Sequence, residues 1–356
     1  MRQRNSLALI TLLAGLAAAC SEDTPDTTGP TPAPGSQAVA AATVTYSIKN
    51  IGTLGGNISE AYDINNVGQT VGWARTAADK THAFLQHAGT MKDLGTLSGG
   101  LSEANAINDA GVVVGYSTLS SGAERAVRWQ NGTIKNLGTL GGRNSRATDI
   151  NQDGVIVGWS MTSSGDTHAF VYQNGMMKDI GTLGGKRSVA NGVSNSGRVV
   201  GMSTTASGKK HAFAWANGKF QDLGDGGTLF GEATAINGWI VGNFGPPPGS
   251  EGGDLDVVSP WIFKAGVFTH IGGFFLHAGF ANDLNKDGIV VGKDEDDRAQ
   301  DPGHAWVHPN GGSTQNLPEL AEDGFDSAEG INSFGTIVGY SDGPDGWAKA
   351  VIWRPQ

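Results

Sequence analysis

The hydrophobic pattern of residues 43–356 consists of short apolar stretches separated by turns. Between residues 147 and 180, for example, four stretches follow one another, reading ATDIN, VIVGWS, HAFVY and MMKDI. Each has the length and the β-branched or aromatic residues typical of a strand, and each ends near glycine, asparagine or aspartate. The turns at 151–154 and 173–175 are short enough to close antiparallel hairpins. No window keeps apolar residues at a spacing of three and four, so no helices are predicted.

This group of four stretches recurs along the chain. The phrase GTLGG starts at Gly52, Gly95, Gly138 and Gly181, 43 residues apart, and in degraded form at Gly224 and Gly272. An apolar pair followed by glycine marks the same unit, and its glycines are Gly72, Gly115, Gly158, Gly201, Gly242, Gly292 and Gly339. Such a repeat predicts an all-β fold, a seven-bladed β-propeller of four-stranded antiparallel blades.

The two ends of the repeat region complement each other. The seventh unit supplies strands near 328–332, 337–341 and 349–353 but no fourth strand, while a spare strand at 43–51 precedes the first unit. We therefore expect this N-terminal strand to complete the last blade and close the ring.

The repeats are similar in amino-acid sequence to a known family. HAFLQHAGTMKDLGTL, HAFVYQNGMMKDIGTL and HAFAWANGKFQDLG, with DINQDGVIVGWS and AINDAGVVVGYS, resemble the HAF-type bacterial extracellular repeats over almost all of residues 43–356. The resemblance implies a secreted or surface repeat protein and carries no activity with it. Three units have Ala126-Val127, Pro260-Trp261 or Ala350-Val351 in place of the HAF phrase. The phrase is therefore interpreted as a structural element.

Residues 1–19 have the pattern of an export signal, with two arginines, an apolar run and small residues before Cys20. The segment LAAAC resembles a bacterial lipobox, which implies acylation of Cys20, although Ala17 stands where leucine is usual. A secretory signal with a chance cysteine is the alternative. Because Ser21 is not the aspartate associated with inner-membrane retention, we expect a lipid-anchored protein of the cell envelope, at the outer membrane or cell surface. Residues 20–42 are rich in proline, threonine and serine and predict a disordered tether.

Composition narrows the function classes. The 56 glycines are explained by the turns of a repeated hairpin fold. The net charge of -10 argues against a general nucleic-acid binder. With a single cysteine, neither a disulfide framework nor a cysteine-rich zinc site can form. No cofactor is expected.

Histidines and acidic turns are the first candidates for chemistry. His82, His168, His211 and His304 all open the third strand of a unit. Equivalent positions in different blades cannot converge on one metal, so each histidine is expected to make a structural hydrogen bond. The turns at 149–154 and 283–288 match the start of a calcium loop, and the candidate ligands are Asp283, Asn285, Asp287 and Asp294. A hairpin turn that favours asparagine and glycine accounts for the same residues and is the preferred interpretation.

Loop lengths point to a binding face. In an up-and-down blade the connections after strands two and four share one face, here named the long-loop face. We expect long, irregular loops there at 75–81, 245–259, 272–279, 294–303 and 320–327. The third and fourth units add a basic cluster to this face, and aromatic residues join it: Arg143, Arg146, Lys186, Arg187, Lys209, Lys210, Phe230, Phe274 and Phe275.

Three functions fit this sequence. The first is a monomeric binding or scaffold lipoprotein that recognises a glycan or a surface protein through the long-loop face, with the membrane as partner of its lipid anchor. The second is an extracellular polysaccharide hydrolase or lyase, and the third is a purely structural envelope protein. Because no G-x-S-x-G sequence or other catalytic constellation is recognisable, the binding hypothesis leads.

Overall fold

The computed structural model describes residues 44–228, 230–245, 258–272, 278–295, 303–322 and 324–356. Thr43–Gln356 forms one compact unit. Cys20, the tether, Phe274 and Phe275 lie outside the described residues. Within the described ranges, no helix has the length and apolar character needed to cross a membrane.

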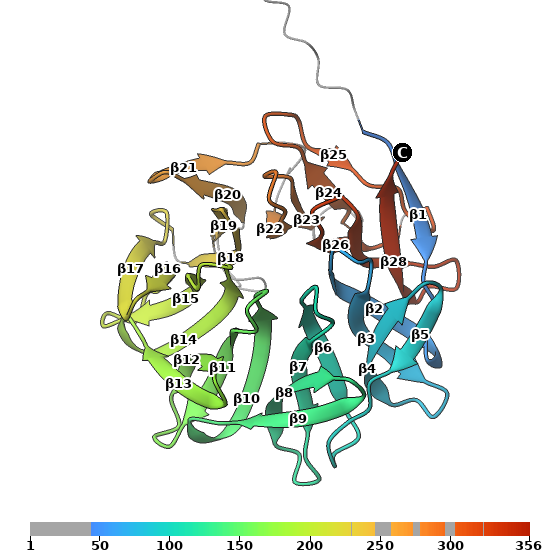
Figure 1. Cartoon of the computed structure of the whole chain (residues 1–356). Coiled ribbons are helices and arrows are strands. Elements are labelled where there is room, and N and C mark those ends of the chain that lie inside the picture. The colour runs from blue at the N-terminus through green and yellow to red at the C-terminus, as the bar shows by residue number, and fades with distance from the viewer. Residues whose placement is uncertain (1–43, 229, 246–257, 273–277, 296–302, 323) are drawn as a thin grey trace, which may run out of the picture. The chain divides into compact units, whose positions relative to one another are not determined.

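The described residues form a β-propeller of antiparallel sheets arranged in a ring, with the first strand of each repeat nearest the centre (Figure 1). Four separate sheets follow chain order. They are β2–β5 (Gly55–Ile64, Thr70–Thr76, Thr81–His87, Thr90–Asp93), β6–β9 (Ser102–Ile107, Val113–Thr118, Glu124–Gln130, Thr133–Gly138), β18–β21 (Gly231–Asn237, Trp239–Phe244, Ser259–Lys264, Val267–His270) and β22–β25 (Ala278–Leu284, Val290–Glu295, Ala305–His308, Gln315–Asn316).

The third and fourth repeats merge into one eight-stranded sheet. It contains β10–β13 (Gly141–Ile150, Ile156–Thr162, Thr167–Gln173, Met176–Gly181) and β14–β17 (Gly184–Val193, Val199–Thr205, Lys210–Ala216, Lys219–Gly224). Within each half the strands pair antiparallel, and one parallel pair, Thr167 with Arg187, joins β12 to β14. Seven separate blades were expected, whereas five four-stranded sheets are separate, because this residue pair links the other two repeats.

The N-terminal strand completes the last sheet. β1 (Tyr46–Asn50) lies antiparallel to β28 (Ala348–Pro355), which continues through β27 (Ile337–Asp342) to β26 (Asp326–Ile331). Tyr46 stands opposite Pro355 and Asn50 opposite Val351. Figure 1 shows the blue β1 beside the red β28. The expected closure by the N-terminal strand is therefore present.

A close approach of the first two strands explains the glycine that ends each apolar pair. A Cβ atom on Gly158 would lie 2.1 Å from the carbonyl oxygen of Arg146 on β10. The register shifts at this point, between Ala147 and Asp149, which brings the two backbones together. The equivalent glycines meet a carbonyl oxygen within 1.8–2.0 Å: Gly72, Gly115, Gly201, Gly242, Gly292 and Gly339. Any side chain here would clash with backbone.

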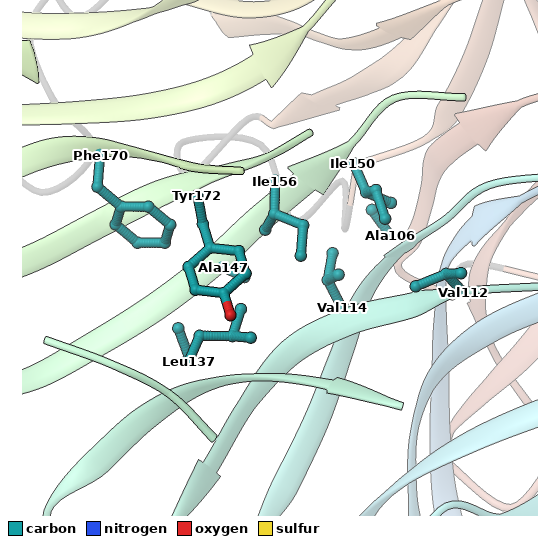
Figure 2. Packing of buried hydrophobic residues seen from close by; sticks show 10 residues of the cluster. Ala106, Val112, Val114, Leu137, Ala147, Ile150, Ile156, Phe170 and Tyr172 are labelled. Carbon is teal, nitrogen blue, oxygen red and sulfur yellow. The ribbon is translucent and has the colours of Figure 1, made fainter. Parts of the chain in front are cut away.

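The core lies between neighbouring sheets. In Figure 2, side chains of the second and third repeats fill one such interface, with Val114 and Leu137 on one side and Ile156, Phe170 and Tyr172 on the other. Phe170 is fully buried. Because each sheet buries both faces against its neighbours, apolar side chains can occur at consecutive positions of the second strand.

Side-chain amides join successive repeats around the ring. The Nδ2 of Asn108 donates to the carbonyl oxygen of Asn151 over 3.1 Å, and its Oδ1 accepts from the Val112 amide in its own turn. The same donation runs from Asn65 to Asn108, from Asn151 to Ser194, from Asn285 to Asn332 and from Asn332 to Asn65. These turns therefore determine the spacing of the repeats.

Candidate functional site

The long-loop face has regular turns in its first four repeats. Between β3 and β4 the Thr76 amide donates to the Lys80 carbonyl and the Asp79 amide to the Thr76 carbonyl, both over 2.9 Å. Asp79 has a φ of 56°, which lets the chain reverse within a few residues. The expectation of a long, irregular loop at 75–81 is therefore wrong. The loops expected at 245–259, 272–279 and 294–303 fall largely on residues 246–257, 273–277 and 296–302, which lie outside the described residues.

The two arginines of β10 are already engaged. Arg146 makes a bidentate ion pair with Glu124, at 2.7 and 2.5 Å, and its guanidinium lies 3.8 Å from the ring centre of Tyr116. Arg143 donates to the Ser121 carbonyl over 3.2 Å. Both residues therefore bind the second repeat, and Arg146 is held in a fixed position.

The remaining basic residues divide into two groups. Lys209 pairs with Asp225 at 3.2 Å, and the Lys210 ammonium lies 5.6 Å from the ring centre of Phe230. Lys186 and Arg187 are exposed on β14. Lys186 makes no hydrogen bond or ion pair with another described residue. The structure thus leaves Lys186 and Arg187 available for a partner, whereas the expected continuous cluster is not formed.

A group of side chains that the sequence did not single out comes together near the axis. We name it the axial arc: Glu60, Tyr62, Trp73, Glu103, Tyr116, Lys293 and Glu329. One carboxylate oxygen of Glu60 accepts hydrogen bonds from the Tyr62 hydroxyl at 2.9 Å and the Trp73 indole nitrogen at 3.1 Å. These bonds fix the carboxylate and both rings in one arrangement.

The arc continues into the last two repeats through Lys293 and Glu329. Burial raises the pKa of the Glu329 carboxyl, and Lys293 partly opposes this increase. The Ser327 hydroxyl donates to Glu329 over 2.5 Å. The Lys293 ammonium lies 5.5 Å from the ring centre of Phe280 and 5.2 Å from that of Phe325. The Lys293 ammonium group is therefore held between carboxylates and aromatic faces.

In the other direction the arc reaches the second repeat through Glu103 and Tyr116. The Tyr116 hydroxyl is hydrogen-bonded to Glu103. The pKa of Tyr116 is raised mainly by burial, and this hydrogen bond raises it further. Burial also raises the pKa of Glu60, and the charge of Glu103 adds to the effect. Carboxylates with aromatic rings that carry polar tips can bind hydroxyl and amine groups of a ligand. A signal was present in the sequence, since Glu60, Glu103 and Glu232 place an acidic residue at equivalent positions of three inner strands.

The candidate calcium ligands serve as turn and inter-repeat contacts. Asp283 accepts from the Leu284 amide at 2.7 Å and from the Ile331 amide of the next repeat at 2.9 Å, and burial raises its pKa to about 7. Asp287 pairs with Lys286 at 2.8 Å, and Asp294 accepts from the His304 amide. Across the described ranges, no three His, Cys, Asp or Glu residues are grouped closely enough to hold a metal ion.

Three of the four repeat histidines make one recurring contact. The Nδ1 atoms of His82, His168 and His211 lie 2.7, 2.7 and 2.9 Å from Asp93, Asp179 and Asp222. Each aspartate also accepts the amide of a GTLGG glycine: Gly95, Gly181 or Gly224. The predicted structural hydrogen bond is confirmed for these three. His304 differs, because its ring lies 3.8 Å from Asp294.

Comparison with known proteins adds evidence on the fold. No family model and no curated protein matches the chain, so the resemblance to HAF repeats stays a prediction. The β-propeller domain of the trilobed protease from Pyrococcus furiosus is similar in structure, with a TM-score of 0.54 and 10% identity over 84% of this chain and 97% of that one.

Two whole peptidases are also similar. They are the acylaminoacyl peptidase of Pyrococcus horikoshii (TM-score 0.56, 10% identity, 85% of this chain and 52% of that one) and a puromycin-hydrolyzing peptidase of Mycobacterium tuberculosis (TM-score 0.51, 11% identity, 84% and 51%). The chain spans about half the length of these two enzymes. At such low identity the likeness shows the β-propeller fold and nothing about chemistry.

Proposed function

We propose that this protein is a lipid-anchored envelope protein that binds a glycan or a surface protein at the axial arc and the long-loop face. The axial arc carries this proposal. Its side chains come from the first, second, sixth and seventh repeats, and hydrogen bonds already hold Glu60, Tyr62 and Trp73 of the first repeat in place. Preorganised polar groups beside rigid aromatic rings bind a ligand at a low entropic cost.

The exposed cations supply a second contact. Lys186 and Arg187 lie at the start of β14, where the chain enters from the long-loop face. Neither side chain makes a hydrogen bond or ion pair with the described residues, although Arg187 acts electrostatically on the buried Glu232. An acidic sugar or an acidic segment of a partner protein would find here the charge that the axial carboxylates do not offer.

The proposal also covers the location of the protein in the cell and the number of blades in the propeller. Acylation at Cys20 and the tether would place the propeller at the outer membrane or cell surface, as the sequence predicts. We count the eight-stranded sheet as two blades, since β10–β13 and β14–β17 each repeat the order of the separate sheets and one residue pair joins them. The ring then has seven blades.

A charge-reversal experiment tests the binding proposal. The full chain would be used to capture partners from envelope extract and to probe a glycan array, beside Lys186→Glu/Arg187→Glu and the control Lys80→Glu. Lys80 is also exposed at the long-loop face, in the first repeat. We expect about a tenfold loss of binding in the double variant and none in the control. Unchanged binding in the double variant would remove this face from the proposal.

Polysaccharide cleavage is a second candidate because two carboxyl groups of the arc have raised pKa values. Burial favours the protonated form of both Glu60 and Glu329, which is the form that a general acid needs. An enzyme would release new chain ends from a bound glycan, and Glu60→Gln or Glu329→Gln would stop this release while binding persists. Binding without release of products supports the first candidate.

A further inference from the structure

A polar cavity of about 160 Å³ lies at the opposite end of the inner strands from the long-loop face. Its walls come from the ends of β2, β6, β10, β14, β18, β22 and β26 and the turns that follow them. We name the face that carries these turns the short-turn face. The cavity is lined mainly by side-chain amides, carboxylates and hydroxyls.

Three aspartates in this cavity are fixed by backbone hydrogen bonds. Asp63 accepts from the Ile64 amide at 2.7 Å through one oxygen and from the Ile107 amide of the next repeat at 2.8 Å through the other. Asp149 and Asp283 make the equivalent pair of bonds. Each carboxylate oxygen keeps a second lone pair, so these residues offer acceptors in fixed positions.

Amide groups of the turns supply donors. The Asp109 amide donates to Gln152 Oε1 at 3.0 Å, and the Gln152 amide donates to Asn195 Oδ1 at 3.1 Å. These bonds occupy the oxygen end of each side chain. The amino groups of Gln152 and Asn195 make no hydrogen bond with any residue in the described part of the chain. Fixed donors and fixed acceptors therefore border one small space.

Two of the turns that border the polar cavity each carry one exposed apolar side chain. Phe334 is 70% exposed and Val67 is 56% exposed, and each is the neighbour of a cavity residue in the chain. The Ser333 amide donates to Asn66 Oδ1 at 3.0 Å, which holds these two turns together. Phe334 and Val67 are thus exposed apolar residues in the turns at the cavity rim.

We propose that this cavity is a second binding site, separate from the long-loop face, and that it takes one neutral sugar ring. A hydroxyl group donates and accepts at once, which matches a wall that offers both amide donors and carboxyl acceptors. The apolar face of the ring would lie against Phe334. The described residues of the lining include no basic side chain, so an acidic sugar would find no counter-charge beside Asp63, Asp109, Asp149 and Asp283.

The volume limits the ligand to one ring. A cavity of about 150 Å³ holds a benzene molecule, whereas drug-sized ligands need about 300 Å³ or more. A site of about 160 Å³ therefore fits a single six-membered ring with its substituents partly in solvent. A metal ion is disfavoured, because among the described residues no three ligating side chains are close enough to share one.

The test is a titration of the full chain, measured by calorimetry and by ligand-observed NMR. The ligands are glucose, galactose, mannose, N-acetylglucosamine, glucuronate and calcium. The variants are Gln152→Ala/Asn195→Ala and Phe334→Ala. Met176→Ala is the matched control, since Met176 is 71% exposed but belongs to the outer hairpin of the third repeat. Lys186→Glu/Arg187→Glu separates this site from the long-loop face.

We expect at least one neutral sugar to bind, with glucuronate at least tenfold weaker. Each cavity variant should lose about tenfold in affinity, and both Met176→Ala and the charge-reversal variant should keep it. Phe334 is exposed, so its variant keeps the test valid if the double variant does not fold. The proposal is overturned if no neutral sugar binds, if glucuronate binds equally well, or if calcium is the species that the cavity takes.

Discussion

Asn332 in the last repeat donates its side-chain amide to the carbonyl oxygen of Asn65 in the first, 3.2 Å away. Its Oδ1 accepts from the amides of Phe334 and Thr336 in its own turn. One buried side chain thus satisfies three backbone groups and connects the two ends of the repeat region. It adds to the pairing of β1 with β28 at the outer side of the same sheet.

We therefore expect Asn332→Ala to lower the free energy of unfolding by about 1–3 kcal/mol, because buried backbone groups lose their partners. Chemical denaturation of the full chain measures this change. Asn237→Ala is the control, since Asn237 is exposed and its side chain makes no hydrogen bond with the described residues. Equal stability of the two variants would contradict the closing role of Asn332.

Stability should fall as pH rises from about 4 to 7. Burial raises the pKa of Asp149 from 3.8 to about 6 and that of Asp283 from 3.8 to about 7. The folded chain therefore binds these protons more tightly than the unfolded chain, and stability that is full below pH 4 is lost towards the folded pKa. Each aspartate contributes a slope of about 1.4 kcal/mol per pH unit within its window.

Melting temperatures measured between pH 4 and 8 test this dependence. Asp283→Asn should flatten the upper part of the profile, because the amide does not titrate. Asp153→Asn, at an exposed turn position, should leave the profile unchanged. A wild-type protein that becomes more stable from pH 4 to 7 would show that the buried aspartates are ionised when folded.

The His168–Asp179 contact should be worth about 1 kcal/mol. Asp179→Ala should cost more than His168→Ala, since Asp179 also accepts the Gly181 amide at 2.7 Å. A double-mutant cycle of the two substitutions measures the coupling, and we expect about 0.5–1.5 kcal/mol. Asp153→Ala serves as the control. A coupling of zero would mean that the recurring pair does not contribute to stability.

Gly158→Ala should destabilise the fold by about 3 kcal/mol or more, because the added Cβ atom would meet the Arg146 carbonyl oxygen at 2.1 Å. In Gly154→Ala, in the neighbouring turn, the added Cβ atom would meet open space. This variant should lose only about 1 kcal/mol of stability, from the strain of a φ of 77°. Denaturant midpoints rank the two variants. If they lose equal stability, the close strand approach is not what requires glycine at position 158.

Much of the fold could be predicted from the order of residues. The repeat of GTLGG, HAF and the glycine after an apolar pair predicts the strands, the hairpins and the completion of the last sheet by the N-terminal strand. The strands and hairpins depend on neighbours in the chain, on turn residues and on a side-chain period of two. The completion of the last sheet follows from counting strands, since the seventh repeat has three and one spare strand precedes the first repeat. The error at 75–81 has the same local origin, since polar residues were interpreted as a long loop although Asp79 can adopt a positive φ.

The merging of two repeats into one sheet and the axial arc depend on positions that are far apart in sequence. The pairing of Thr167 with Arg187 is decided by the distance between two sheet edges. Likewise Glu60 and Lys293 interact only because the ring brings the first and sixth repeats close to the seventh at its axis. The sequence by itself determined the repeat, its turns and its strands. Only the tertiary structure decided which charged and aromatic side chains meet, because convergence at an axis is a property of the closed ring.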